Sequence, residues 1–329
     1  MSGKIKIAIA TGDPAGIGPE ISLKAALDPK VRAVCDPIVV SDLRVLDRHA
    51  KACGIKAELR GVKRIGEAQW SGGQINVLDC ALPYAAAIDL GTNSVDAGRA
   101  IVAFAGAAVK AARAGEVDAV AAAPQNETSI ALAGIPFDGH PSFVARETGT
   151  DVDDVYLMLC FGERRIVHAT LHTSVREAIG MITRERVIKV IRTADRALRQ
   201  LGIERPRICV SGLNPHAGED GLFGREEIEV IRPAIDTAAA EGISVSGPIG
   251  ADILFHKQGH DAFVVMLHDQ GHIAAKLLAP NATAAMTIGT PILFASVAHG
   301  SAHDIAGKGI ANPAAMIEAI MQLAKARRG

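Results

Sequence analysis

The chain has 329 residues, of which 49% are hydrophobic and only 3% aromatic, and its formal net charge is −1. This length predicts two domains, and the near-neutral charge without a long basic run argues against a nucleic-acid-binding protein. No apolar run is long enough to span a bilayer, and the first ten residues lack the pattern of a signal peptide. The five cysteines are scattered without Cys-x-x-Cys spacing, so we expect reduced thiols in a cytoplasmic protein.

Strand and helix patterns alternate along the chain. Buried strands are predicted over residues 4–10, 37–41, 117–123, 207–211 and 262–267. Helices are predicted from Gly18, from the caps at 92–94 to about Ala114, over 184–201, over 225–241 and over 313–327. Pro233 should kink or split the fourth of these helices. The alternation predicts βαβ units and a largely parallel sheet, that is, an α/β fold.

Residues 266–276, Met-Leu-His-Asp-Gln-Gly-His-Ile-Ala-Ala-Lys, are the most informative segment. The imidazole of His268, the carboxylate of Asp269 and the amine of Lys276 can together polarise a hydroxyl, remove its proton and hold the oxyanion. They follow a buried strand, and open α/β sheets place their sites at the carboxyl ends of strands. A solvated polar loop is the alternative interpretation, but this position favours a functional site.

Three histidines, His172, His216 and His268, each follow a strand-like run. Imidazoles at strand ends can converge on one edge of a sheet and bind a divalent cation, with Zn, Co, Mn, Ni and Mg all left open. Spacing alone does not prove convergence, and any one of the three is more often structural. His272 is expected beside this site. The loop over residues 12–18 is neither a dinucleotide fingerprint nor a P-loop, so it is either a tight turn or an anion-binding turn.

Residues 299–313, HGSAHDIAGKGIANP, resemble the adenosine-binding loop of the isopropylmalate and isocitrate dehydrogenases, with His303 as the main departure. The resemblance implies NAD binding. It places these residues at the cofactor: His299, Gly300, Ser301, Ala302, Asp304 and Asn312. Asp304 takes the position that faces the adenosine ribose, where a carboxylate pairs with a free 2′-hydroxyl and repels a 2′-phosphate, so NAD is preferred to NADP.

Five segments, taken together and in order, resemble the 4-hydroxythreonine-4-phosphate dehydrogenases of vitamin B6 (pyridoxine) biosynthesis. They are residues 12–20, 133–140, 214–219, 250–252 and 268–271. The resemblance covers essentially the whole chain and implies an isopropylmalate dehydrogenase-like fold, two α/β/α domains with a cleft between them. One domain would combine residues 1–130 and 280–329 on the cofactor side. The other, over 131–279, would carry the metal and substrate and form a homodimer with a shared active site.

The same resemblance assigns residues to roles. The family's metal ligands fall on His172, His216 and His268, and its substrate contacts on His140 and Lys276. Asp252 and Asp269 match acidic residues beside the metal. These residues imply NAD-dependent oxidation of a secondary hydroxyl β to a carboxylate, followed by decarboxylation, with Lys276 as the base. A Lys276 that only neutralises substrate charge is the alternative.

Four positions depart from the family pattern: Glu127, Pro141, Ala285 and Phe294. Phe294 stands for an arginine, Ala285 for an asparagine and Pro141 for a threonine, and only the arginine binds phosphate with a planar fork. These departures resemble the terephthalate dihydrodiol dehydrogenase branch, so a non-phosphorylated cis-dihydrodiol carboxylate and another sugar-acid phosphate stay open as substrates. A non-catalytic homologue and a metal-dependent hydrolase or aldolase are the rival classes, and NAD dependence separates them.

Overall fold

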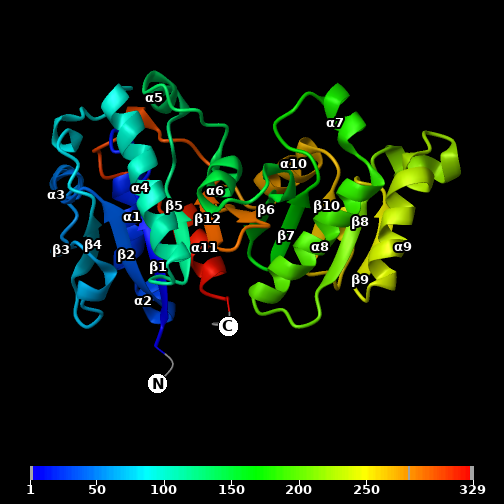
Figure 1. Ribbon diagram of the computed structural model, residues 1–329, viewed down its shortest axis with the longest axis horizontal. Coiled ribbons are helices and arrows are strands. Elements are labelled where there is room, and N and C mark those ends of the chain that lie inside the picture. Colours follow the sequence, from blue (N-terminus) through cyan, green and yellow to red (C-terminus); the bar gives the residue numbers. More distant parts are fainter. Residues whose placement is uncertain (1–2, 281, 327–329) are drawn as a thin grey trace. The chain divides into compact units, whose positions relative to one another are not determined.

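The structure is a computed structural model that describes residues 3–280 and 282–326, which form two compact units (Figure 1). Unit 1 comprises Met1–Thr150 and Thr290–Gly329, and unit 2 comprises Asp151–Gly289. The boundaries expected at residues 130 and 280 both lie earlier in the chain than these. Residues 131–150 join unit 1 because helices α5 (Glu127–Leu132) and α6 (His140–Thr148) pack on helix α4 (Val95–Arg113).

Unit 1 contains a parallel sheet in the order β3-β4-β2-β1-β5-β12. Its strands are β1 (Ile5–Ala10), β2 (Cys35–Ser41), β3 (Leu59–Val62), β4 (Ile75–Asp79), β5 (Ala119–Ala122) and β12 (Leu293–Val297). Successive residues of β1, Ile7 and Ala8, are both fully buried. Because successive side chains point to opposite faces, both faces of this sheet are covered, as in parallel sheets generally.

Helices cover the sheet of unit 1. Besides α4, α5 and α6 they are α1 (Gly18–Leu27), α2 (Pro29–Val34), α3 (Leu43–Ala52) and α11 (Ala314–Leu323). Helix α4 begins after Ser94, whose hydroxyl accepts a hydrogen bond from the amide of Ala97 at 3.1 Å, as its position before the alanine-rich run predicts. Ala108 and Val109 of this helix share one core cluster with Ala8 of β1.

Unit 2 contains a mixed sheet in the order β11-β6-β7-β10-β8-β9. Its strands are β6 (Tyr156–Phe161), β7 (Arg164–His168), β8 (Arg207–Ser211), β9 (Ser244–Ile249), β10 (Ala262–Val265) and β11 (Ala284–Ile288). Strand β6 is antiparallel to both neighbours, whereas β7, β10, β8 and β9 run parallel to one another. The carboxyl ends of these four adjacent strands therefore meet along one edge.

The helices of unit 2 are α7 (Val175–Met181), α8 (Arg184–Gln200), α9 (Arg232–Ala240) and α10 (His268–Leu278). Pro233 lies in the first turn of α9, and the preceding turn, Glu227–Ile231, is π-helical, so the helix predicted over residues 225–241 is split as expected. In unit 1, α11 ends at Leu323, and the predicted end at Arg327 lies outside the described residues. Within the described ranges, no helix combines the length and apolarity that a membrane crossing needs.

One local prediction is corrected by the structure. Strand β10 ends at Val265 rather than at Leu267, and His268 opens helix α10. The helix begins there because Gln270 accepts hydrogen bonds from the amides of Met266 and Leu267, at 2.9 and 3.0 Å, through its side-chain oxygen. The segment with most of the predicted chemistry is therefore the first turns of a helix.

Candidate functional site

Four neighbouring strands of unit 2 each lead into a predicted site residue. His172 follows β7, His268 opens the helix after β10, His216 follows β8 and Asp252 follows β9. The four strands are parallel and adjacent, so these residues emerge at the same edge of the sheet. Gln270 of α10 also donates to the carbonyl of Gly212 at 3.1 Å, which ties the start of that helix to the loop after β8.

His172 and His268 are neighbours, with ring centroids 5.6 Å apart. The Nδ1 of His268 lies 2.7 Å from Oδ1 of Asp269, so the carboxylate holds one edge of the ring and leaves Nε2 on the other. This contact with His268 lowers the pKa of Asp269. Both imidazoles and Asp269 line a hollow of about 290 Å³ beside β7 and β10.

Two further histidines of unit 2, His272 and His168, lie beside this pair. The ring of His272 is stacked on that of His268, with centroids 3.7 Å apart, and the ring of His168 lies 4.7 Å from His272. Burial lowers the pKa of His272 to about 4 and that of His168 to about 3, so both rings are neutral near pH 7. His168 is a buried strand residue. His272 was expected beside the site, and it forms the face on which His268 rests.

His216 lies in an unusual turn. Residues 216–220 all have positive φ, and four of them, His216, Ala217, Glu219 and Asp220, are not glycine. Each such residue costs roughly 1–2 kcal/mol, and strain of this kind concentrates at functional sites. The imidazole Nδ1 lies 3.2 Å from Glu219, and the ring meets Phe223 edge-on, so His216 is turned toward its own loop.

A buried carboxylate holds the start of this turn. Glu227, only 4% exposed, accepts hydrogen bonds from the amides of Leu213 and Asn214, both at 2.7 Å, and from the side-chain amide of Asn214 at 2.9 Å. Asp252 lies close to the same loop, because a Cβ built on Gly250 would be 2.7 Å from its Oδ1 and 3.4 Å from the Cα of His216. No local sequence pattern links Glu227 to this loop.

Imidazole nitrogens are suitable ligands for a divalent transition metal, but only two of the three predicted rings lie close enough together to share one ion. Two imidazoles bound to one ion through nitrogen have centroids roughly 5 Å apart, close to the 5.6 Å between His172 and His268. The third predicted ligand, His216, does not face them, and across the described residues no three His, Cys, Asp or Glu side chains are arranged as a metal site. The structure thus brings together two members of the predicted triad.

Lys276 lies on the same helix as His268 and His272. It is exposed, and it lies on the helix that also carries Asp269. Helical periodicity places residues 268, 272 and 276 along one side of α10. The predicted acid–base group is therefore on the histidine-bearing side of the helix.

The predicted cofactor loop belongs to unit 1. Ser301 is 9% exposed, Ala302 has a φ of 43°, and Asp304 is exposed, as a residue that contacts a ligand must be. His299 contacts only the carbonyl of Gly300 among the hydrogen bonds described for its ring, at 3.1 Å. Asn312 accepts a hydrogen bond from the amide of Ala314 at 2.9 Å, at the start of α11.

The predicted substrate residues of unit 1 form an aromatic cluster. His140 opens α6, followed by Pro141, and its ring lies 5.3 Å from that of Phe294 and 6.3 Å from that of Phe137. Burial lowers the pKa of His140 to about 4, and its Nε2 is buried without a partner. Phe294 is fully buried. In unit 2, Ala285 is only 7% exposed.

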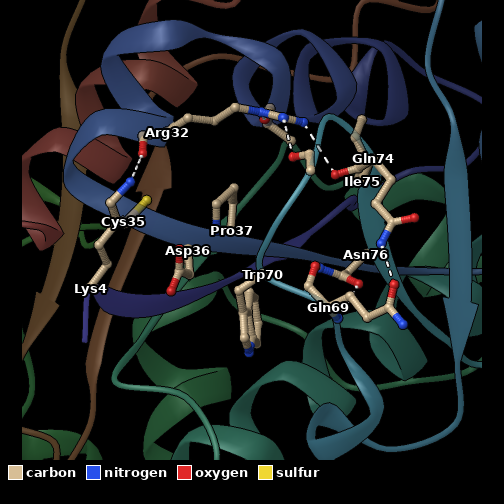
Figure 2. Close-up of a pocket in the computed structure, with 12 residues that line it drawn as sticks. Lys4, Arg32, Cys35, Asp36, Pro37, Gln69, Trp70, Gln74, Ile75 and Asn76 are labelled. Carbon is tan, nitrogen blue, oxygen red and sulfur yellow. Dashed lines mark hydrogen bonds between the residues drawn. The ribbon is translucent and has the colours of Figure 1, made fainter. Parts of the chain in front are cut away.

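A separate hollow of about 160 Å³ lies at the opposite edge of the sheet of unit 1, at the amino ends of β1, β2 and β4 (Figure 2). Arg32 reaches across it and donates to the carbonyls of Gly72 and Gln74 (Figure 2), and also to that of Gly73. Asn76 donates to the carbonyl of Gln69 at 2.8 Å. These groups fasten the loop before β4, and the hollow lies away from the carboxyl ends where α/β sites occur.

Comparison with known proteins gives consistent matches over the whole chain. The family model described as "Pyridoxal phosphate biosynthetic protein PdxA" matches residues 33–323. A 1,2-dihydroxy-3,5-cyclohexadiene-1,4-dicarboxylate dehydrogenase of Comamonas sp is 40% identical, with 97% of this chain and 96% of the relative covered. A putative D-threonate 4-phosphate dehydrogenase of Symbiobacterium thermophilum is 41% identical, with the same shares covered. The crystal structure of a 4-hydroxythreonine-4-phosphate dehydrogenase from Burkholderia phymatum superimposes with a TM-score of 0.88 at 37% identity, covering 99% of both chains.

Proposed function

Because the chain belongs to the PdxA family of dehydrogenases, we propose that it oxidises a secondary hydroxyl β to a carboxylate, with NAD and a divalent metal ion, and that decarboxylation follows. The observation that carries this proposal is the set of four parallel strands that lead into His172, His268, His216 and Asp252. Such an edge collects metal-binding and acid–base groups at one place in unit 2.

In this proposal His172 and His268 would hold the metal, with His216 as the third ligand. The bound cation would supply Lewis-acid stabilisation of negative charge on the substrate oxygens. Asp269 fixes the ring of His268, so that Nε2 is the free nitrogen. Lys276 would take the proton from the hydroxyl as the neutral amine, a form that a neighbouring divalent cation favours, and Asp269 or Asp252 would accept a hydrogen bond from it. The loop over residues 299–304 and Asn312 would bind NAD, which would supply the hydride acceptor.

The metal assignment has a direct test. Zn²⁺ or Co²⁺ titrated by calorimetry into the apoprotein should bind one ion per chain, and His172→Ala and His268→Ala should abolish binding. His216→Ala should weaken binding without abolishing it, because this ring is not yet grouped with the other two. Unchanged affinity in His268→Ala would overturn the assignment. A Lys276→Met variant that binds metal normally but turns over at the wild-type rate would overturn the base assignment.

For the substrate, we propose a non-phosphorylated diol carboxylate. Phe294 and a neutral His140 form the aromatic cluster of unit 1, and neither offers the positive charge that recognises phosphate. The 41% identity to a putative D-threonate 4-phosphate dehydrogenase favours a phosphorylated sugar acid as the second candidate. NAD reduction by the metal-loaded protein should be assayed with cis-dihydrodiol carboxylates, phosphorylated sugar acids and 4-phosphohydroxy-L-threonine. Turnover of phosphorylated acids alone would overturn the first choice.

Asp304 supports NAD rather than NADP, because its exposed carboxylate would repel a 2′-phosphate. The wild type should reduce NAD faster than NADP at equal concentration. In Asp304→Ser the ratio of the rate with NAD to the rate with NADP should fall, because the rate with NAD should decrease more than the rate with NADP. An unchanged ratio would show that Asp304 does not read the ribose.

We also propose that the protein is a homodimer. Helix α10 presents an apolar row to solvent in the single chain: Ile273, Leu277 and Leu278 are 58%, 77% and 54% exposed. Exposed apolar residues gathered on one element are typical of an interface. Light scattering should give the mass of two chains, and Leu277→Lys should shift the protein toward one chain. A wild type that is monomeric at micromolar concentration would overturn this proposal.

A further inference from the structure

A buried carboxylate in unit 1 is paired with a histidine 290 residues away in the sequence. Asp13, in the loop after β1, is fully buried. Its Oδ1 accepts a hydrogen bond from the amide of Ala15 at 2.9 Å, and its Oδ2 lies 2.6 Å from Nε2 of His303. A carboxylate without exposure needs such a partner, because an unpaired buried charge is strongly unfavourable.

In the hydrogen bond between His303 and Asp13, the imidazole is the donor. An ionised carboxylate only accepts, so Nε2 of His303 carries the hydrogen and donates it to Asp13. The side-chain nitrogen of Asn126 lies 3.1 Å from the same Nε2 but donates to Oδ1 of Asn93 at 2.8 Å, because a protonated ring nitrogen has no lone pair that could accept. Its orientation is fixed, because the side-chain oxygen of Asn126 caps α5 by accepting from the amide of Ser129 at 3.0 Å. The Nε2 edge of His303 is thus enclosed by Asp13 and Asn126.

The loop that contains His303 is strained between two anchors. On one side, the amide of Ile17 donates to the carbonyl of Ser301 at 2.9 Å. The two segments are so close there that a Cβ on Gly16 would lie 2.5 Å from that carbonyl oxygen. On the other side stands the pair of His303 and Asp13. Between them Ala302 has a φ of 43°, a left-handed conformation that alanine adopts only when its neighbours impose it.

We infer that His303 is a positioning residue, which holds residues 299–304 in their strained conformation through Asp13 and thereby sets the affinity for the adenosine part of the cofactor. Without the imidazole, Asp13 loses its partner on Oδ2, and one of the two anchors beside Ala302 is lost. The loop then relaxes, and a nucleotide that needs the strained form must reorder it at a cost in affinity. His303 is the position at which this loop differs from the dehydrogenases it resembles. In this structure the differing residue forms a hydrogen bond with Asp13.

The inference rests on the proposed function, since NAD is taken as the ligand of this loop, and the experiment therefore has readouts both without and with nucleotide. Hydrogen–deuterium exchange of residues 299–304 is measured in the full chain without nucleotide. NADH affinity is measured by fluorescence titration, and KM for NAD and kcat are measured with the metal-loaded enzyme. The variants are His303→Leu and His303→Gln, whose side-chain amide can still donate to Asp13. His256→Leu, at an exposed histidine of unit 2, is the control.

In His303→Leu we expect faster exchange in the loop, NADH binding weaker by about tenfold, or about 1.4 kcal/mol, a higher KM for NAD and an unchanged kcat. His303→Gln should recover most of the affinity, and His256→Leu should match the wild type. In a double-mutant cycle, Asp13→Asn should have a smaller effect in the His303→Leu background than in the wild type. If His303→Leu does not fold, the comparison of His303→Gln with Asp13→Asn tests the same pair.

The experiment distinguishes failure of the proposed NAD binding from failure of the proposed role of His303. A wild type that binds no NAD overturns the proposed function, while faster exchange in His303→Leu would still support the anchoring of the loop. A wild type that binds NAD, together with variants that bind equally well and exchange at the same rate, overturns the role of His303. Equal losses of kcat and affinity in the Leu and Gln variants would also overturn it, because the donor would then not matter.

Discussion

The rings of His268 and His272 lie face to face, with centroids 3.7 Å apart and planes within 9° of each other. Imidazole nitrogens bind metals in the plane of the ring, so two parallel stacked rings cannot direct lone pairs at one ion. His272 therefore supports His268 rather than joining it as a ligand. Since Asp269 fixes the edge of the same ring at 2.7 Å, the plane and the edge of His268 are both determined before any ion binds.

His272→Ala should weaken metal binding, because His268 would lose the surface that fixes its plane. Outer contacts of this kind are worth about 10–100-fold in metal affinity, and we expect about tenfold. Competition against a chromogenic chelator gives the measurement, with His256→Ala, an exposed histidine of the same unit, as the control. An affinity equal to that of the wild type would show that the stack does not support the ligand.

Gly271→Ala should destabilise the protein, although alanine is the better helix former. A Cβ on Gly271 would lie 2.3 Å from Nε2 of the buried His168, so the ring or the helix must move, at a cost of about 1–3 kcal/mol. Gly106→Ala is the matched control in α4, where a Cβ would meet nothing within 4 Å. That change should stabilise by up to about 1 kcal/mol. Urea denaturation checks both, and two changes of the same sign would contradict this account.

Glu227→Ala should cost about 2–5 kcal/mol of unfolding free energy, because it leaves the partly buried amides of Leu213 and Asn214 without their acceptor. Glu226→Ala is the control. It removes one hydrogen bond to the side chain of Asn214 from a less buried position and should cost less than about 1.5 kcal/mol. Denaturant titrations at pH 7 separate the two variants. Equal losses would mean that Glu227 does not hold the turn.

The pH dependence of stability should include a contribution from His140. Burial lowers its pKa in the folded state to about 4, against about 6.5 in the unfolded chain. Between these values the unfolded chain binds a proton that the folded chain does not, so the stabilisation is present above pH 6.5 and is lost as the pH falls toward 4. His140→Phe keeps a ring beside Phe294 without a titrating group. Its unfolding free energy should fall less steeply on acidification, by up to about 1.4 kcal/mol per pH unit, and a parallel slope would contradict the assignment.

The sequence predicts the elements with strong periodicity and clear ends. Strand β8 is found over Arg207–Ser211 as predicted, and α8 over Arg184–Gln200 is within one residue of the prediction. Both have apolar patterns bounded by charged or capping residues, so local rules suffice. Strand β3, Leu59–Val62, was missed because it is four residues long, includes a glycine and is only partly buried.

The candidate site is less predictable because its parts are joined by long-range pairing. The sequence places His172, His216 and His268 after strands, but nothing in it tells that β10 lies between β7 and β8. The turn over residues 216–220 has no local signal, since alanine, glutamate and aspartate do not favour positive φ. The spacing of four between His268 and His272 is typical of one helix face. The apolar run predicts a strand up to Leu267 and no helix after it, so this spacing does not enter the prediction.

The order of strands also bears on synthesis. Unit 1 places β12, residues 293–297, directly beside β5, residues 119–122, and so all of unit 2 is translated before the sheet of unit 1 receives its last strand. In unit 2 the inner strand β10 follows both β8 and β9 in the chain. Neither sheet can be completed from the N-terminus forward on the ribosome. The exposed edge of β5, an apolar Ala-Val-Ala-Ala strand, is therefore the part of the nascent chain that most needs protection from mispairing.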